Sequence, residues 1–289
     1  MNGKFSLLAS KKTLNCRGRM LVLNRPLVMG ILNATPDSFY DGGKFDNPTS
    51  ALKHAETLLT EGATILDLGA YSSRPNAPHI SEQEEKERLL PILKAIRIEF
   101  PEAFISIDTF RSSIANVALD VGADMINDIS GGNLDAQLPK IAAAYNVPYV
   151  CMHMVGTPQT MQQHAVDGQI MPEMLRFFSL KMAALKADGL HDIILDPGFG
   201  FGKTLDQNYE LARHLSELGI FNHPILVGVS RKSMINKVLD TVPETALNGT
   251  TALHARLLAF GADILRVHEV KEAVEAVKIH IALNPTALS

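Results

Sequence analysis

Polar and ionisable side chains recur immediately after short apolar runs in this sequence. They belong to Asn33, Ser72, Ser73, Arg74, Asp108, Asn127, Asp128, His153, Asp196, Ser230, Arg231, Lys232, Ser233, Arg266 and His268. Arginine, lysine and histidine donate hydrogen bonds to phosphate oxygens. Carboxylates and carboxamides pair with the N–H groups of an aromatic heterocycle. The combination indicates a binding site for a ligand that contains both kinds of group.

A loop that contains glycine follows Asn33 and adds two carboxylates, Asp37 and Asp41. Amide and carboxylate oxygens are ligands that Mg²⁺ accepts beside a substrate phosphate, so we expect Mg²⁺ at this loop. Structural roles are open alternatives for several of these residues. Asp37 follows a proline, as turn residues often do, and Asn127 or Asp128 can cap a helix.

The segment 197–204 resembles two nucleotide-binding patterns without matching either of them. The first glycine of a phosphate-binding loop would fall on Pro197, and the third glycine of a dinucleotide fingerprint would fall on Lys203. The segment instead predicts a flexible glycine turn that carries Phe199 and Phe201 and allows close approach by a flat ligand.

The candidate site needs a scaffold that brings its residues to one face. Gly62, Gly122 and Gly261 each close a helical pattern and precede a short apolar run. Glycine is the usual left-handed residue after a helix, and apolar runs without alternation are typical of buried parallel strands. The pattern predicts eight strands: Leu27–Leu32, Thr64–Leu68, Phe104–Ile107, Met125–Asn127, Tyr149–Met152, Ile193–Leu195, Ile225–Val229 and Ile264–Val267.

Helical patterns separate these eight runs. One helix begins at Pro48, residues 81–84 form a capping-box pattern, Pro91 predicts a kink or a break, and a long helix ends near Gly189. Eight strand–helix units predict a single (β/α)₈ TIM barrel over residues 1–289, with all strands ending at the working face. A doubly wound sheet is the alternative. A hairpin over about residues 5–24 is expected to close the bottom of the barrel.

Composition limits the class of protein. The 289 residues are 46% hydrophobic and 20% charged, with a net charge of −4, so we expect neither a nucleic-acid nor a membrane partner. No apolar run approaches the roughly 20 residues that span a bilayer. The two cysteines, Cys16 and Cys151, favour a reducing, cytoplasmic location. His153 lies beside Cys151, but no second pair follows, so a zinc site is not expected.

The ordered motifs resemble the dihydropteroate synthase family of pterin-binding barrels from Met29 to about Val270. The resemblance rests on Met29–Phe39, Ser106–Thr109, Ile126–Asp128, Met152–Met154, Asp196–Lys203, Ser230–Ser233 and Arg266–His268. It implies that the amine of p-aminobenzoate displaces pyrophosphate from (7,8-dihydropterin-6-yl)methyl diphosphate, giving 7,8-dihydropteroate for folate biosynthesis. It also implies a homodimer built on the last helices and a target of sulfonamides.

The same resemblance implies a role for each matching residue. Residues that would hold the pterin are Asp108, Asn127, Met152, Asp196, Phe201, Gly228 and Lys232. Residues that would grip the diphosphate are Asn33, Arg74, Arg266 and His268, with Mg²⁺ bridging it to Asn33. Residues of the p-aminobenzoate pocket would be Phe39, Ser73, Arg74, Pro75, Phe201, Lys232 and Ser233. Catalytic roles would fall on Asp37, Asp41, Asp108 and Lys232, with a pterin cation formed as the diphosphate leaves.

Three positions depart from the commoner family pattern: Tyr71 replaces a glutamate, Ser73 a threonine, and Glu269 an aspartate. They concern details of the p-aminobenzoate pocket rather than the reaction. Two alternatives share the fold. A methyltetrahydrofolate-dependent corrinoid methyltransferase would not need the diphosphate grip of Arg266 and His268, and a silent pterin-binding barrel would not need it either.

Overall fold

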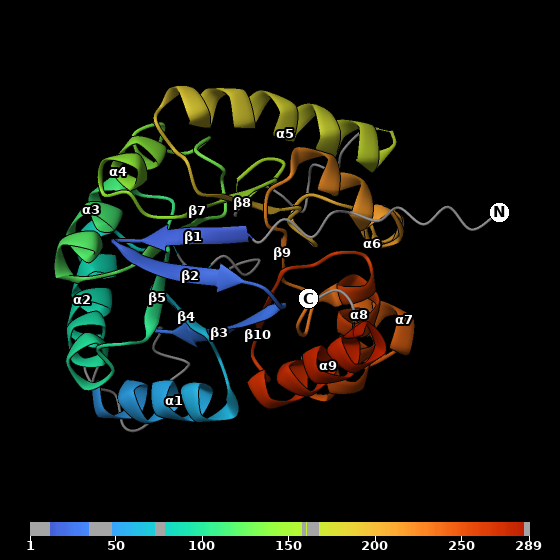
Figure 1. Cartoon of the computed structure of the whole chain (residues 1–289), viewed down its shortest axis with the longest axis horizontal. Helices are drawn as coiled ribbons and strands as arrows, with labels where there is room; N and C mark the ends of the chain where they lie inside the picture. The colour runs from blue at the N-terminus through green and yellow to red at the C-terminus, as the bar shows by residue number, and fades with distance from the viewer. Residues whose placement is uncertain (1–11, 35–47, 73–78, 158–159, 161–167, 286–289) are drawn as a thin grey trace.

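The computed structural model describes residues 12–34, 48–72, 79–157, 160 and 168–285. Within them, eight strands lie side by side in the order β8-β7-β6-β5-β4-β3-β10-β9 (Figure 1). Their bounds are β3 Leu27–Asn33, β4 Ile65–Gly69, β5 Phe104–Asp108, β6 Met125–Asp128, β7 Tyr149–Met152, β8 Ile193–Asp196, β9 Leu226–Val227 and β10 Ile264–Val267. All neighbouring pairs are parallel, and a bridge between Leu195 and Ile225 joins the two ends of the sheet. The barrel prediction is confirmed.

Helices surround the strands in chain order. Their bounds are α1 Pro48–Glu61, α2 Glu82–Glu99, α3 Ser112–Val121, α4 Leu138–Ala144, α5 Ile170–Ala187, α6 Leu205–His214, α7 Ser233–Leu239, α8 Leu247–Ala259 and α9 Val270–Leu283, with 3₁₀ turns at Leu215–Phe221 and Pro243–Thr245. Ser81 caps α2 by accepting a hydrogen bond from the backbone N–H of Glu84. Of the kink or break predicted at Pro91, the break is absent, because α2 continues through it with Leu89, Ile92 and other apolar residues buried on both sides.

Side chains alternate between the two faces of each barrel strand. In β8, Ile194 belongs to the cluster inside the barrel, whereas Leu195 packs with the helices outside. Asp196 follows Ile194 by two residues, so it faces the interior again. The same spacing holds for Asp67 after Ile65, Asn127 after Met125, Met152 after Val150 and Arg266 after Ile264. The period of the strand therefore sets these residues directly above the apolar interior.

A two-stranded hairpin covers the opposite end of the barrel. Strands β1 (Lys12–Cys16) and β2 (Arg19–Leu23) pair antiparallel around a turn in which Arg17 and Gly18 both have positive φ, 55° and 86°. Such two-residue turns match the twist of the strands. The hairpin buries Leu14 and Leu21 against the apolar interior layer. The predicted hairpin is confirmed over its described part, while residues 5–11 lie outside the described residues.

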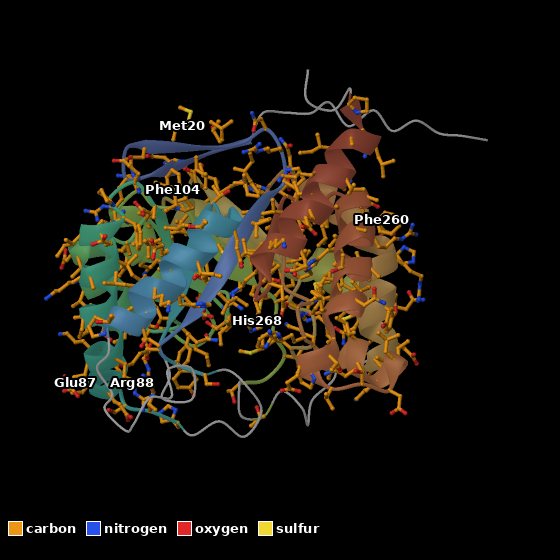
Figure 2. All side chains as sticks on the ribbon, turned by 90° about the horizontal axis from the view of Figure 1, so that it is seen from below. Met20, Glu87, Arg88, Phe104, Phe260 and His268 are labelled. Atoms are coloured by element: carbon orange, nitrogen blue, oxygen red, sulfur yellow. The ribbon has the colours of Figure 1, made fainter. Side chains whose placement is uncertain are left out.

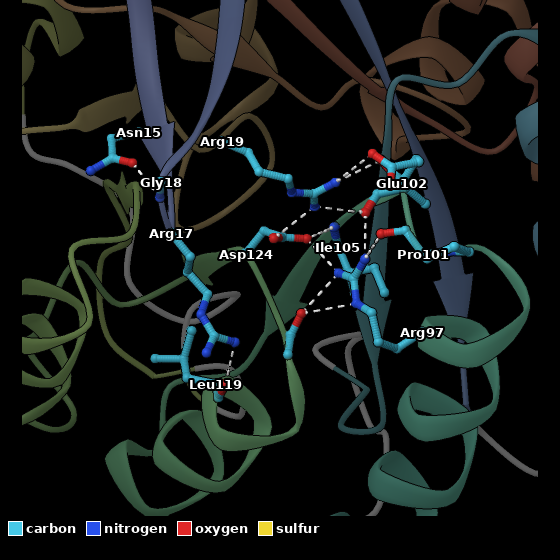
Figure 3. Close-up of polar contacts among 12 residues, drawn as sticks. Asn15, Arg17, Gly18, Arg19, Arg97, Pro101, Glu102, Ile105, Leu119 and Asp124 are labelled. Carbon is cyan, nitrogen blue, oxygen red and sulfur yellow. Dashed lines mark hydrogen bonds and ion pairs between the residues drawn. The ribbon is translucent and has the colours of Figure 1, made fainter.

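Charged side chains fasten this hairpin to the barrel (Figure 3). Arg19 Nη2 donates to Asp124 Oδ1 at 2.8 Å, and Arg97 Nη2 donates to Asp124 Oδ2 at 2.5 Å. The backbone N–H of Ile105 donates to the same carboxylate at 2.9 Å. Figure 2 shows Met20 of the hairpin at one end of the molecule and His268 toward the other. The hairpin end is thus separate from the strand ends that carry the candidate site.

Candidate active site at the carboxyl ends of the strands

Four interior side chains form one polar network where β4, β5, β6 and β10 end. Arg266 Nε donates to Asp67 Oδ2 at 2.6 Å, and Arg266 Nη2 donates to Asp108 Oδ2 at 2.6 Å. Asn127 Nδ2 donates to Asp67 Oδ2 at 3.0 Å. The structure therefore brings together three residues predicted for the site and adds a fourth, Asp67.

Asp67 was missed by the sequence analysis. It lies inside β4 rather than after it, and its side chain is fully buried. Among the described residues, none donates a hydrogen bond to its Oδ1. The available signal was a single charged residue in an apolar strand, two positions after the interior residue Ile65. Strand alternation alone would have placed that carboxylate inside the barrel.

Burial and charge act against each other in this network. Burial raises the pKa of the Asp108 carboxyl to about 7, and the Arg266 guanidinium opposes that rise. Burial by itself would lower the pKa of Arg266, but Asp67 and Asp108 outweigh it and raise that pKa. Arg266 therefore stays charged, and Asp108 is a desolvated carboxylate that gains from any further positive charge nearby.

Two further ionisable side chains of the site are Asp196, the last residue of β8, and Lys232, which precedes α7. Asp196 Oδ1 accepts a hydrogen bond from the backbone N–H of Gly198 at 2.7 Å, and burial raises the pKa of Asp196. Lys232 Nζ donates to the backbone carbonyl of Phe199 and lies 4.4 Å from the ring centre of Phe201. Burial lowers the pKa of Lys232 to about 8, against the opposing charge of Asp196.

Apolar side chains line the space beside this pair. Ile129, Met152 and Met154 form a buried cluster on which Phe110 and Phe201 pack. Two residues predicted to form a slot for a flat ring, Met152 and Phe201, thus contact the same cluster. Carboxylates at one side and an apolar surface at the other are what a polar heterocycle needs for orientation and stacking.

The glycine turn 198–202 is held in place by its surroundings. Gly198 has φ of +65°, and a Cβ built on it would lie 2.0 Å from the carbonyl oxygen of His153, so only glycine fits. Lys203 Nζ donates to the carbonyls of His153, Gly198 and Phe201 at 3.3, 2.7 and 3.1 Å. The turn that was expected to be flexible is therefore tied down by Lys203, to which sequence analysis gave no role.

The candidate anion side is built by the segments after β9 and β10. His268 Nδ1 lies 2.9 Å from Ser230 Oγ, and Ser230 Oγ lies 3.0 Å from Glu269 Oε2. Arg231 Nη2 forms an ion pair with Glu269. The departure at Glu269 from the commoner aspartate thus has a local role, because the longer carboxylate reaches two partners.

Three more of the predicted residues are described, and each lies at or after a strand end. Asn33 is the half-buried last residue of β3, and Ser233 is the exposed first residue of α7. The half-buried Gly228 follows β9, and a Cβ atom added to it would lie 3.8 Å from the Cβ atom of Arg266. Asp37, Phe39, Asp41, Ser73, Arg74 and Pro75 lie outside the described residues.

Tyr71, another departure, is buried before the undescribed segment 73–78. Its ring packs edge-on against Phe110 at 4.9 Å, and its hydroxyl lies 3.2 Å from Nδ1 of His79. Tyr71 thus joins both flanks of that segment.

Nowhere in the described ranges does a helix combine the length and the apolar character that crossing a membrane requires.

Comparisons with known proteins agree with this arrangement. The family described as pterin binding enzyme matches residues 29–268. A dihydropteroate synthase of Synechocystis sp. is 46% identical over 262 residues, 90% of each chain. The structure of Yersinia pestis dihydropteroate synthase with a sulfonamide drug complex has a TM-score of 0.89 at 42% identity, covering 95% of this chain and 100% of that one. Dihydropteroate synthase from Xanthomonas albilineans in complex with 7,8-dihydropteroate has a TM-score of 0.84 at 34% identity, covering 94% and 98%.

Proposed function

The chain belongs to the family of pterin-binding enzymes, as a dihydropteroate synthase within it, and from this premise we propose how its residues carry out the reaction. The enzyme transfers a pterinylmethyl group: it condenses (7,8-dihydropterin-6-yl)methyl diphosphate with 4-aminobenzoate to give 7,8-dihydropteroate and diphosphate, in folate biosynthesis. The observation that carries the assignment of roles is the network of Asp67, Asp108, Asn127 and Arg266 at the barrel mouth.

The pterin ring is assigned to the side of the mouth that has carboxylates and apolar surface. Asp196 would accept hydrogen bonds from the amino and ring N–H groups, and Lys232 would donate to a ring acceptor. Met152 and Phe201 would contact the ring face, and their packing in one cluster supports this. Asn127 and Gly228, at neighbouring strand ends, complete the set of residues proposed for the pterin.

The diphosphate is assigned to Arg266, His268, Asn33 and Arg74. Arginine forks pair well with phosphate oxygens, and the leaving group carries about three negative charges that must be stabilised. Arg266 links the two assignments, because it already pairs with Asp108, which is assigned to the pterin. The p-aminobenzoate pocket is proposed from residues next to these; of Phe39, Ser73, Pro75 and Ser233, the structure describes only Ser233.

Mg²⁺ is proposed as the metal, held by Asn33. The half-buried Asn33 at the strand end offers one neutral amide oxygen, and within the described residues no group of three or more His, Cys, Asp or Glu forms a metal site. Mg²⁺ usually keeps several waters and takes oxygens of substrate phosphates as ligands, so a single amide oxygen of the protein fits it. When bound, the ion would neutralise charge on the diphosphate.

We assign Asp108 to the stabilisation of positive charge on the pterin. Its carboxylate is desolvated and shares its guanidinium partner with Asp67, so a cation that develops nearby improves its environment. Loss of diphosphate ahead of amine attack is the path that this charge favours. Asp37 and Asp41 are proposed to assist from the loop after Asn33, by helping to exclude the water that would capture the cation.

A homodimer formed through the last helices is proposed as the assembly, in the reducing cytoplasm. Exposed apolar residues on these helices are Leu247 of α8 and Ile279 and Leu283 of α9. A dimer would cover such a group, and Cys16 and Cys151 are both free and buried, as a reducing compartment allows. Ile279→Glu in α9 should convert a dimer into a monomer in sedimentation velocity. A monomeric parent protein would contradict the proposal.

The test of the reaction is pyrophosphate release by the purified protein with the dihydropterin diphosphate and Mg²⁺. With 4-aminobenzoate present, release should match formation of 7,8-dihydropteroate. Slow release without the amine would support bond breaking before attack. Binding of pterin with no release under either condition would contradict the assigned roles of Asp108 and Arg266.

A further inference from the structure

The side chain of Lys203 binds the backbone of the glycine turn that precedes it. In a phosphate-binding loop, whose pattern residues 197–204 partly share, the lysine reaches the phosphates of the ligand. Lys203 Nζ instead donates to the carbonyl oxygens of Gly198 and Phe201 at 2.7 and 3.1 Å. Its third hydrogen bond goes to the carbonyl oxygen of His153, directly after β7, at 3.3 Å. Lys203 therefore joins the turn to the end of a neighbouring strand.

These three contacts use every donor that a lysine ammonium group has. A neutral amine has only two N–H bonds, whereas an ammonium group has three and accepts no hydrogen bond. Burial and the charge of Lys232 lower the pKa of Lys203, but the carboxylate of Asp196 opposes them and three carbonyl oxygens favour the charged form. Lys203 thus has no donor left for a ligand, and it acts through the backbone that it holds.

One carbonyl group of the same turn is directed at a second ammonium group. The backbone carbonyl of Phe199 accepts a hydrogen bond from Lys232 Nζ. The ring centre of Phe201, whose own carbonyl is held by Lys203, lies 4.4 Å from the same Nζ atom. The turn that Lys203 fixes therefore supplies two of the neighbours that set the position of Lys232.

Asn208 of α6 holds the turn from its N–H side. Its Oδ1 accepts from the backbone N–H of Gly200 at 2.6 Å, and its Nδ2 donates to the carbonyl oxygens of Lys203 and Thr204 at 3.3 and 2.7 Å. Asn208 has no contact with the carbonyl groups that Lys203 binds, so it does not replace the lysine. Without Lys203, those carbonyl groups would turn toward water, and the backbone of the turn would move with them.

We propose that Lys203 is a positioning residue: its ammonium group fixes the glycine turn, so that the Phe199 carbonyl and the Phe201 ring hold Lys232 in place for the pterin. This role rests on the proposed pterin site, whereas the link between Lys203 and the turn does not. The resemblance to the family leaves this lysine without a role.

The decisive experiment removes the ammonium group and then supplies it in solution. Lys203→Ala deletes the atoms that propylammonium can replace, whereas Lys203→Met fills most of the same space without an N–H donor. Both variants should bind 6-hydroxymethylpterin about tenfold more weakly than the parent in calorimetry, as expected when hydrogen bonds from a charged group are lost. Propylammonium should restore the affinity of Lys203→Ala but not that of Lys203→Met.

Two controls separate this effect from ionic strength and from the loss of any lysine. Tetramethylammonium carries the charge but no N–H group, so it should leave the affinity of Lys203→Ala unchanged at equal ionic strength. Lys140→Met changes an exposed lysine of α4 and should bind the pterin like the parent protein.

Hydrogen–deuterium exchange of residues 198–202 in the full-length protein without ligand tests the link to the turn by itself. The backbone N–H groups of Gly198, Gly200 and Phe201 are all hydrogen-bonded in the turn. They should exchange faster in Lys203→Ala than in the parent protein, and propylammonium should slow them again.

Four results would overturn the proposal: parent-like pterin affinity in Lys203→Met, no restoration of Lys203→Ala by propylammonium, equal restoration by tetramethylammonium, or unchanged exchange in the turn. Failure of the parent protein to bind the pterin would count against the proposed pterin site. The exchange experiment would still decide in that case whether Lys203 fixes the turn.

Discussion

Asp108 is the residue on which the proposed chemistry depends most. Asp108→Asn keeps the size and polarity of the side chain but removes the charge that would stabilise a pterin cation. Turnover should fall about a hundredfold or more, which is typical for loss of a preorganised electrostatic group, while KM for 4-aminobenzoate should change little. Steady-state kinetics measure both quantities.

The control for this variant is Asp188→Asn, at the exposed end of α5. It should leave turnover unchanged. Near-normal turnover of Asp108→Asn would show that the carboxylate charge has no role in the reaction.

The pKa values at the site predict a narrow pH optimum. As pH falls through about 7, Asp108 becomes protonated and loses its negative charge. As pH rises through about 8, Lys232 loses its positive charge. The profile of kcat/KM should therefore decline on both sides of the interval between these values.

Lys232→Arg separates the two limbs of that profile. Arginine keeps its charge at high pH. The decline of kcat/KM on the alkaline side should therefore move to higher pH, while the decline on the acid side stays at the same pH. An unchanged alkaline limb would mean that another group produces it.

Some residues of the site could be predicted from the sequence, and others could not. Asp108, Asn127 and Asp196 were found because they end strands, where a barrel presents its working groups. Asp67 was missed because it lies inside β4, two residues before the end of the strand, among apolar neighbours. The contact between Ser230 and Glu269 could not be inferred either, since the two residues meet only when β9 and β10 are adjacent.

At the scale of elements, hydrophobic pattern and glycine position were enough to predict all eight barrel strands to within one or two residues at each end. Both signals are local, and each strand is buried on both faces, so the apolar run itself marks it. The break allowed for at Pro91 does not occur, and the reason is not local. Tertiary packing of Leu89, Ile92 and Leu93 keeps α2 continuous although the local rule disfavours a helix there.

The hairpin and the barrel bottom yield a stability prediction. Asp124→Ala removes a buried carboxylate and leaves two arginines and the N–H of Ile105 without that partner. Unfolding free energy should fall by about 3 kcal/mol, as expected when one member of a buried ion pair is lost, with turnover at 25 °C unchanged. Urea denaturation monitored by circular dichroism measures the loss.

A matched control uses the other carboxylate near Arg19. Glu102 is exposed and lies 3.8 Å from Arg19 Nη1, so Glu102→Ala should cost less than about 1 kcal/mol. Equal effects of the two substitutions would show that the Asp124 cluster does not fasten the hairpin.

At the scale of the whole molecule, the two ends of the barrel have separate tasks. The hairpin, Asp124 and the apolar layer below Asp67 stabilise the fold, while charged groups that are costly to bury gather at the other end. Asp108, Asp196 and Lys232 all have pKa values moved by burial toward the neutral form. Burying these groups lowers the free energy of unfolding, but the same desolvation strengthens their interaction with charge that develops on a substrate.

This separation predicts the effect of removing the metal. A structural metal lowers the stability of a protein when it is withdrawn. Here, Mg²⁺ is proposed to be held by Asn33 together with substrate oxygens, so the protein alone should bind it weakly. EDTA should abolish turnover and pyrophosphate binding, leave the melting temperature within error of the untreated protein, and leave binding of a pterin without diphosphate intact. Added Mg²⁺ should restore turnover, and Asn33→Ala should require more of it. A melting temperature that falls with EDTA would instead indicate a metal built into the fold and would remove the reason for assigning Mg²⁺ to the diphosphate.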